Sequence, residues 1–345
     1  MKKKAVTIYD IAQRLGLSPS TISRALRDDH RINAGTIELV NRTAREMSYQ
    51  SNRVAAGLRG GSTRTIGIMV PRIARQFFAS AISGISEVAR RRGYQVVITQ
   101  SNEQLAVEKE NVSALTAARV DGLIASLCME TRDTDHFDRL LQRQFPIVFF
   151  DRVIMSTPAS RVIVTDEASA QTAVRHLIEG GARRIAHLGG PESINIYQAR
   201  HRGYLQALEK AGLPADPRLV ERDCLLEERG HAAASRMMQL PDPPDAVFSA
   251  SDFSALGFIT YCREHGIRIP EEVAIVGFAN EPFTKIMSPE LSSVEQFSER
   301  MGAAAAELLF RKIDAGDDEL PPEQIVIEGE LQVRASSRRQ PLGHG

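Results

Sequence analysis

The sequence has few cysteines and no long apolar run. Its cysteines fit neither a disulfide framework nor a metal-ligand spacing, because they are far apart and odd in number: Cys128, Cys224 and Cys262. Reduced thiols in the cytoplasm are the simplest expectation. No run reaches the length of a membrane-spanning helix, and charged residues from Asp10 onward interrupt the segment where a secretory signal would be apolar. We therefore expect a cytoplasmic chain with no membrane partner.

Motifs of catalysis are also missing. Gly189-Gly190-Pro191 follows a predicted strand, but neither a phosphate-loop Lys-Ser/Thr nor a GxGxxG pattern is present. The eight histidines are scattered and do not support a Ser/His/Asp arrangement. We expect no enzyme activity, no cofactor and no metal.

The zero net charge conceals an uneven distribution. Residues 1–64 hold twelve Lys and Arg against five Asp and Glu, which leaves 31 against 38 for the remainder. A basic segment joined to an acidic remainder is typical of a nucleic-acid-binding head.

Three short helices are predicted in this basic segment. Thr7, with Asp10 three positions on, forms a capping box for the first helix, and Gly16 ends it. Ser18 before Pro19 caps a second helix, and Asn33 caps a third that ends near residue 49. The first two helices and their short turn fit a helix-turn-helix, although an ordinary helical hairpin has the same pattern.

The segments TIYDIAQRLGLSPSTISRAL and SYQSNRVAAGLRGG resemble the head and hinge of LacI/GalR transcriptional regulators, and the resemblance continues along nearly the whole chain. It implies that the second helix enters the major groove, where Arg24 forks onto a guanine. It also implies a hinge helix over 52–59 whose Leu58 wedges into the minor groove. Packing of Leu58 between head and body is the alternative. The expected DNA-binding residues are Thr7, Ser18, Pro19, Ser20, Thr21, Ser23, Arg24, Arg27, Asn52, Ala55, Leu58 and Arg59.

The hinge departs from the usual family pattern at three positions. Ser51 stands where proline is common, Ala56 replaces an arginine, and Gly57 replaces a small hydroxyl residue. Glycine lowers helix propensity by about 1 kcal/mol relative to alanine. We expect a hinge that is less ordered off DNA and has one phosphate or minor-groove contact fewer.

From Thr65 onward, short apolar runs alternate with amphipathic helices, which predicts parallel sheets with helical crossovers. The expected fold class is an N-terminal three-helix helix-turn-helix head plus hinge helix, then a two-lobed α/β body. The resemblance makes this body the type I periplasmic-binding-protein fold. The expected domains are a head at 1–50, a hinge and linker at 51–64, and an effector-binding and dimerisation body at 65–340. The expected lobes are about 65–162 with 296–322, and about 163–295 with 323–340.

Ligands of such sheets bind beyond the carboxyl ends of the strands. The side chains expected there to hold an effector, partly from strand ends and partly from the resemblance, are Phe77, Phe78, Asp151, Arg152, Asn195, Arg200, Phe248, Ser251, Asp252 and Asn280. Arg200 is the favoured clamp, since a planar fork holds two oxygens, with a salt bridge across the lobes as its alternative. For Asp252 the alternative to effector binding is a structural role, as the cap of the helix that starts at Phe253. Ala279 stands where many family members carry an effector-binding aspartate, so we expect Asn280 or a water to replace it.

Together these features predict a repressor that binds a palindromic operator as a homodimer and associates with the nucleoid when bound. A small effector between the lobes, a sugar or sugar derivative, is expected to control it. The short polar C-terminus, 338–345, gives no support for a tetramer. A sugar receptor with no role on DNA would have the same body, but the basic head and the lack of a signal peptide argue against it.

Overall fold

The computed structural model describes residues 6–26, 28–49, 62–316, 318 and 320–339. The chain divides into two units, Met1–Thr63 and Arg64–Gly345. No helix in the described ranges has the length and hydrophobicity needed to cross a bilayer.

The described part of the first unit contains three helices: α1 (Ile8–Leu15), α2 (Pro19–Ala25) and α3 (Ala34–Glu46). The predicted caps are confirmed. The backbone N of Thr7 donates to the Asp10 carboxylate at 2.7 Å, and the Ser18 hydroxyl accepts from the N–H of Thr21 at 3.1 Å. Asn33 caps α3 in the same way at 2.8 Å.

A small apolar core holds these helices together. Ile11 of α1, Ile22 of α2 and Val40 of α3 have no exposed surface. Gly16 ends α1 with φ +64°, a backbone conformation that costs glycine little. The turn that it permits sets α1 against α2 as in a helix-turn-helix.

The second unit contains two six-stranded sheets. The first runs in the order β11-β5-β4-β3-β1-β2, and all of its strand pairs are parallel. Its strands are β1 (Thr65–Val70), β2 (Gln95–Gln100), β3 (Gly122–Ala125), β4 (Ile147–Phe150), β5 (Ser160–Val164) and β11 (Gln324–Ile327).

The second sheet runs in the order β12-β10-β9-β8-β6-β7, and only β12 is antiparallel to its neighbour. Its strands are β6 (Ile185–Leu188), β7 (Val220–Glu221), β8 (Ala246–Ser249), β9 (Ala274–Phe278), β10 (Ser292–Glu295) and β12 (Glu330–Gln332).

Two strands, β5 and β11, belong to the first sheet, whereas the sequence predicts them in the second. We expected residues 162–164 to begin the second lobe and the strand near residue 324 to rejoin it. Instead, β5 pairs with β4 and with β11 in the first sheet, and only β12 returns to the second. The expected lobe boundaries near 163 and 323 are corrected accordingly, because backbone hydrogen bonds join both segments to the first sheet.

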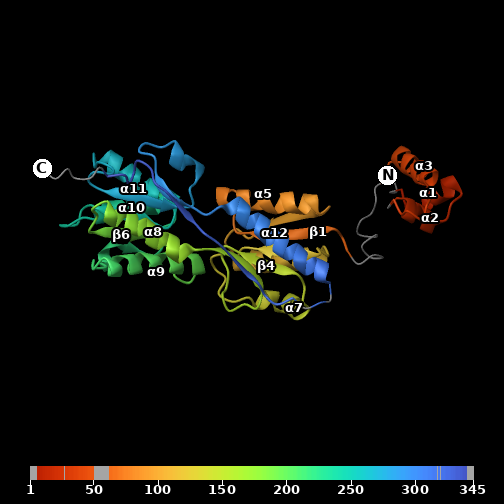
Figure 1. Cartoon of the computed structure of the whole chain (residues 1–345), viewed down its shortest axis with the longest axis horizontal. Coiled ribbons are helices and arrows are strands. Elements are labelled where there is room, and N and C mark those ends of the chain that lie inside the picture. The colour runs from red at the N-terminus through yellow and green to blue at the C-terminus, as the bar shows by residue number, and fades with distance from the viewer. Residues whose placement is uncertain (1–5, 27, 50–61, 317, 319, 340–345) are drawn as a thin grey trace. The chain divides into compact units, whose positions relative to one another are not determined.

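Helices cover both sheets: α5 (Gln76–Arg91), α6 (Leu105–Ala117), α7 (Asp138–Gln142), α8 (Asp166–Glu179), α9 (Asn195–Lys210), α10 (Glu227–Met237), α11 (Asp252–Glu264) and α12 (Ser298–Ala315). Three 3-10 turns, η1 (Asp135–Phe137), η2 (Pro217–Leu219) and η3 (Pro282–Lys285), complete the described elements. Figure 1 shows α12 beside α5 on the first sheet, and both helices contribute to the same buried core. Their axes approach closely, because a Cβ at Gly302 would lie 2.0 Å from the Ala81 carbonyl oxygen.

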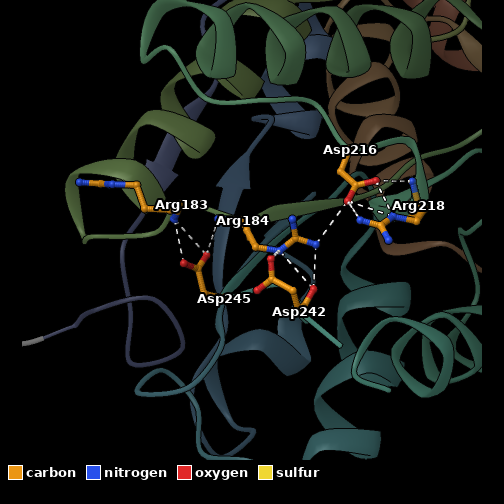
Figure 2. Close-up of polar contacts among 6 residues, drawn as sticks. All are labelled: Arg183, Arg184, Asp216, Arg218, Asp242 and Asp245. Carbon is orange, nitrogen blue, oxygen red and sulfur yellow. Dashed lines mark hydrogen bonds and ion pairs between the residues drawn. The ribbon is translucent and has the colours of Figure 1, made fainter. Parts of the chain in front are cut away.

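A charged cluster fixes the start of β6 (Figure 2). The Asp245 carboxylate accepts from the backbone N of Arg183 at 2.8 Å and of Arg184 at 3.0 Å. The Arg184 guanidinium bridges Asp216, at 3.3 Å, and Asp242, at 2.9 Å. These contacts satisfy the polar groups where β6 begins, at the edge of the sheet opposite the carboxyl ends of its parallel strands.

Candidate functional site

The helix α2 presents the side chains expected to read DNA. Ser20 and Arg24 are exposed, while Ile22 and Ala25 are buried against the head core. Among the described residues, Arg24 has no hydrogen-bond or ion-pair partner, so all five N–H groups of its guanidinium remain for other contacts. The Ser18 hydroxyl, by contrast, is held by its cap and lies 2.8 Å from the hydroxyls of Ser20 and Thr21.

The other expected DNA contacts divide into two groups. Thr7 is exposed beside the start of α1, and Pro19, Thr21 and Ser23 are half-buried on α2. The remaining expected contacts lie outside the described residues: Arg27, Asn52, Ala55, Leu58 and Arg59.

In the second unit, a cavity of about 460 Å³ is lined mainly by loop and helix residues that adjoin the two sheets. Loops after β1, β4, β8 and β9 contribute to its wall, as the strand-end rule predicts. The expected effector residues that line the cavity are Phe77, Phe78, Asp151, Arg152, Arg200 and Ser251. Polar groups among aromatic faces in a cavity of this size are typical of a small-molecule site.

Asp151 and Arg152 form the wall after β4. Asp151 has φ +59°, and burial raises the pKa of its carboxyl to about 7, against the nearby charges of Arg152 and Arg200. Arg152 donates from Nη1 to both carboxylate oxygens of Glu103, at 2.8 and 3.0 Å, and its guanidinium lies 5.9 Å from the ring centre of Phe78. The Asp151 carboxyl has no hydrogen-bond partner among the described side chains and is therefore available to a ligand.

Arg200 is buried and held on three sides. Its Nε donates to Asp166 Oδ1 at 2.8 Å, its Nη1 donates to the Ala250 carbonyl at 2.9 Å, and its Nη2 lies 2.8 Å from the same Asp166 oxygen. The guanidinium is stacked 3.7 Å from the ring centre of Phe278. The ion pair joins α9 to α8, both of which pack in the core of the second sheet, so the alternative of a salt bridge across the lobes is wrong.

Four expected effector residues are not among those that line the cavity. Phe248 is fully buried in β8, where its ring stacks on His187. Both polar atoms of the Asn195 side chain are hydrogen-bonded to the backbone after β4. Nδ2 donates to the Asp151 carbonyl and Oδ1 accepts from the Val153 N–H, each at 3.0 Å.

The side chains of Asp252 and Asn280 are hydrogen-bonded to other protein groups and do not line the cavity. Asp252 accepts from the Glu281 N–H at 2.8 Å and from the Ser293 hydroxyl at 2.7 Å. Asn280 donates to Glu295 at 2.7 Å and accepts from Arg334 at 2.6 Å. Asn280 therefore does not replace the missing aspartate in this arrangement, since its amide is already occupied.

Ala279, at the position where the resemblance places an effector-binding aspartate, also lines the cavity. Further lining residues were not predicted from the sequence: Arg72, Arg75, Glu103, Met129, Ile196, Tyr197, Asp223, Leu225, Leu226, Arg229, Ala250, Phe253, Phe278, Glu281 and Gln296. Arg75, Glu281 and Gln296 follow the strands β1, β9 and β10, so the strand-end rule contained the signal for these three. The Arg75 guanidinium stacks on Phe253 at 4.1 Å from the ring centre and thereby joins a first-sheet loop to α11.

Comparison with known proteins identifies the class of molecule. The family of bacterial regulatory proteins of the lacI type matches residues 7–52, and a periplasmic-binding-protein-like domain matches residues 174–337. Over 343 residues the chain is 30% identical to the HTH-type transcriptional repressor CytR of Escherichia coli (strain K12), covering 99% of this chain and 98% of CytR. The chain belongs to the LacI family. It is likewise 30% identical to the repressor PurR of Vibrio atlanticus (strain LGP32), covering 91% of this chain and 93% of that one.

Solved structures of transcriptional regulators agree with this assignment. The Lac repressor dimer bound to operator and the anti-inducer ONPF matches with a TM-score of 0.86 and 26% identity, covering 97% of this chain and 99% of that one. The complex of the regulator CelR with cellobiose matches with a TM-score of 0.73 and 29% identity, covering 96% and 99%. The predictions of a DNA-binding transcriptional regulator and of the two-part fold are confirmed, and the relatives are regulators rather than enzymes.

Proposed function

We propose that this LacI-family chain is a repressor that binds a palindromic operator as a homodimer, under the control of a sugar or sugar derivative. The observation that supports effector control is the cavity of about 460 Å³, which is lined by loop and helix residues from the sides of both sheets. An effector that touches both sheets binds one lobe arrangement better than another, which is the requirement for coupling.

The proposed division of labour follows the chain. Residues 1–50 read the operator, 51–64 form the hinge and linker, and 65–340 bind the effector and dimerise. The exposed Arg24 and Ser20 on α2 support the assignment of the head. For a DNA-binding regulator of this kind the site of action is the cytoplasm, at the nucleoid when it is bound.

Two observations support the dimer. The matched Lac repressor structure is a dimer. In this chain, β2 is an edge strand of the first sheet and leaves Val97 and Ile98 each 39% exposed. An edge strand with apolar side chains is a surface that proteins usually cover. A two-fold dimer reads two symmetric half-sites, which is why the operator is proposed to be palindromic.

Selection of bound duplexes from a random pool tests the proposal, with the full chain and a panel of sugars and sugar acids. We expect a palindrome to be enriched, and one compound to change that enrichment. A pool with no enriched sequence, together with heat stabilisation of the protein by a sugar, would instead support a sugar receptor.

A further inference from the structure

The segment after β9 brings an unexpected carboxyl to the cavity. Ala279 and Glu281 line the wall, whereas the amide of Asn280 between them is bonded to Glu295 and Arg334. The backbone has φ +115° at Ala279 and +49° at Asn280, so the chain turns sharply there. The turn leaves a carboxyl at the cavity wall two positions after Ala279.

Glu281 is held firmly by its backbone and left open at its side chain. Its N–H donates to Asp252 Oδ2 at 2.8 Å, and Pro282 follows it at the start of η3. Glu281 is only 7% exposed, yet its carboxylate oxygens have no hydrogen bond or ion pair among the described residues. A carboxyl that lines the cavity without a protein partner is open to a donor supplied by a ligand.

Charged side chains of both signs line the cavity. Three of its five arginines are paired with a carboxylate: Arg152 with Glu103 at 2.8 Å, Arg200 with Asp166 at 2.8 Å, and Arg229 with Asp223 at 3.8 Å. The remaining two arginines, Arg72 and Arg75, equal in number the two unpaired carboxyls, Asp151 and Glu281. Whenever those two carboxyls are ionised they repel an anionic ligand beside them, whereas the hydroxyls of a neutral ligand can donate to them.

From this geometry we propose that Glu281 is a specificity-determining residue and that the effector is neutral and polyhydroxylated. Its hydroxyls donate to Asp151 from the first-sheet side and to Glu281 from the second-sheet side, while aromatic side chains such as Phe77 and Tyr197 cover its apolar face. The inference rests on the proposed effector function and narrows its ligand class. Sugar acids and phosphorylated sugars are thereby disfavoured.

Binding of the effector is expected to depend on pH, because Glu281 and Asp151 titrate near neutral pH. Burial and the Asp252 carboxylate raise the pKa of Glu281 to about 7, against the charge of Arg75. Burial likewise raises the pKa of Asp151 to about 7; the surrounding charged groups are Arg152, Arg200, Asp166 and Glu103. Hydroxyl donors favour the ionised carboxyls, so affinity for the effector rises as pH increases through about 7.

Calorimetric titration of the full chain tests the proposal. The probes are neutral sugars and nucleosides, cellobiose among them, each matched with its uronate, aldonate or monophosphate. We expect a neutral member to bind more tightly than its anionic counterpart. Glu281→Gln should weaken that binding roughly tenfold to a hundredfold, because a hydrogen bond to a charged group is lost. Glu271→Gln, at an exposed carboxylate, is the matched control and should change nothing.

Three readouts separate the possible failures. Tighter binding of an anionic probe, no binding of any neutral probe, or unchanged affinity in Glu281→Gln each overturns the inference. The slope of affinity against pH between about 6 and 8 should fall by about half in Glu281→Gln, since Asp151 still titrates; an unchanged slope overturns the role of Glu281. Operator selection with the same protein is independent of these results, so its failure counts against the proposed function instead.

Discussion

Arg200 and Asp166 are locked together behind the cavity wall, with Arg200 Nε and Nη2 both 2.8 Å from a single oxygen of Asp166. Both side chains are more than nine-tenths buried. Burial alone raises the pKa of the Asp166 carboxyl, and the Arg200 charge opposes that rise. At least two of the five guanidinium N–H groups remain for a ligand after these contacts and the one to Ala250. The arginine is therefore fixed in place before any ligand arrives.

We expect Asp166→Asn to lower the free energy of unfolding by roughly 3 kcal/mol, because it leaves the buried Arg200 charge without its counterion. Urea denaturation measures the change. The adjacent Glu167 pairs with Arg202 at 2.9 Å on the exposed side of α8, so Glu167→Gln is the control and should cost below about 1 kcal/mol. Equal losses in the two variants would contradict a special role for the buried pair.

Arg200→Lys retains a positive charge near Asp166 but loses the planar fork and its stacking on Phe278. We expect the ligand response to fall at least about tenfold, with operator affinity in the absence of ligand unchanged. Operator titrations with and without the effector measure both quantities. A variant that responds as the wild type does would remove Arg200 from the effector site.

Asn195 joins α9, on the second-sheet side, to the chain after β4, on the first. We expect Asn195→Ala to weaken effector binding by about 1–3 kcal/mol, because the Val153 N–H and the Asp151 carbonyl both lose their partner. Calorimetry gives the affinity, and small-angle scattering of the ligand-free protein reports whether the lobes separate. Asn195→Asp keeps the acceptor for Val153 and should lose less; an equal loss would mean that the donor alone matters.

Local structure in the head was predictable because each signal acts over a few residues. Ser18 and Asn33 cap their helices through side chains that accept from backbone N–H groups three positions on, and the Asp10 side chain accepts from the N–H of Thr7 three positions before it. No distant part of the chain has to be known for such contacts. Gly16 likewise ends α1 through its own backbone conformation.

Strand partners were not predictable in the same way. The β5 and β11 segments are short and rich in Val and Ile, so their patterns identify strands but contain no information about the neighbouring strand. Pairing of Val162 with Ile325 joins residues far apart in sequence, and it depends on the packing of the whole lobe. The expected lobe boundaries were wrong for this reason.

The effector site shows the same limit at the level of side chains. The strand-end rule located the loop after β9, but the positive φ values at Ala279 and Asn280 determine which side chain reaches the cavity. Neither alanine nor asparagine requires a positive φ, so the sequence does not reveal this turn. The sequence therefore predicts Asn280 at the cavity wall, whereas the structure has Glu281 there.

Arg24→Ala should relax the preference for one base pair in each half-site and cost about 1–3 kcal/mol on the preferred operator, if the exposed fork reads a guanine. Titration of operators that carry each base pair at every position measures this. Arg14, which is exposed on α1 and pairs with Glu46 at 3.4 Å, supplies the control variant Arg14→Ala. A uniform loss over all sequences would demote Arg24 to a phosphate contact.

Asp151→Asn should change how stability depends on pH. The native carboxyl keeps its proton up to a pKa of about 7, whereas the ordinary value is 3.8. Between these values the native state binds more protons than the unfolded state, so the wild type loses stability as pH rises and levels off above about 7. Asparagine cannot titrate and tolerates φ +59°. Relative to wild type, the variant should therefore gain roughly 2–3 kcal/mol in free energy of unfolding between pH 5 and pH 8.

Chemical denaturation at several pH values measures that difference, and Glu271→Gln, at an exposed carboxylate, should show none. The variant should also lose effector binding, since the carboxylate that stabilises the ligand is the one that destabilises the ligand-free protein at neutral pH. A constant offset from wild type at all pH values would mean that Asp151 is ionised throughout this range. In that case the proton coupling of the cavity would have to reside in Glu281 alone.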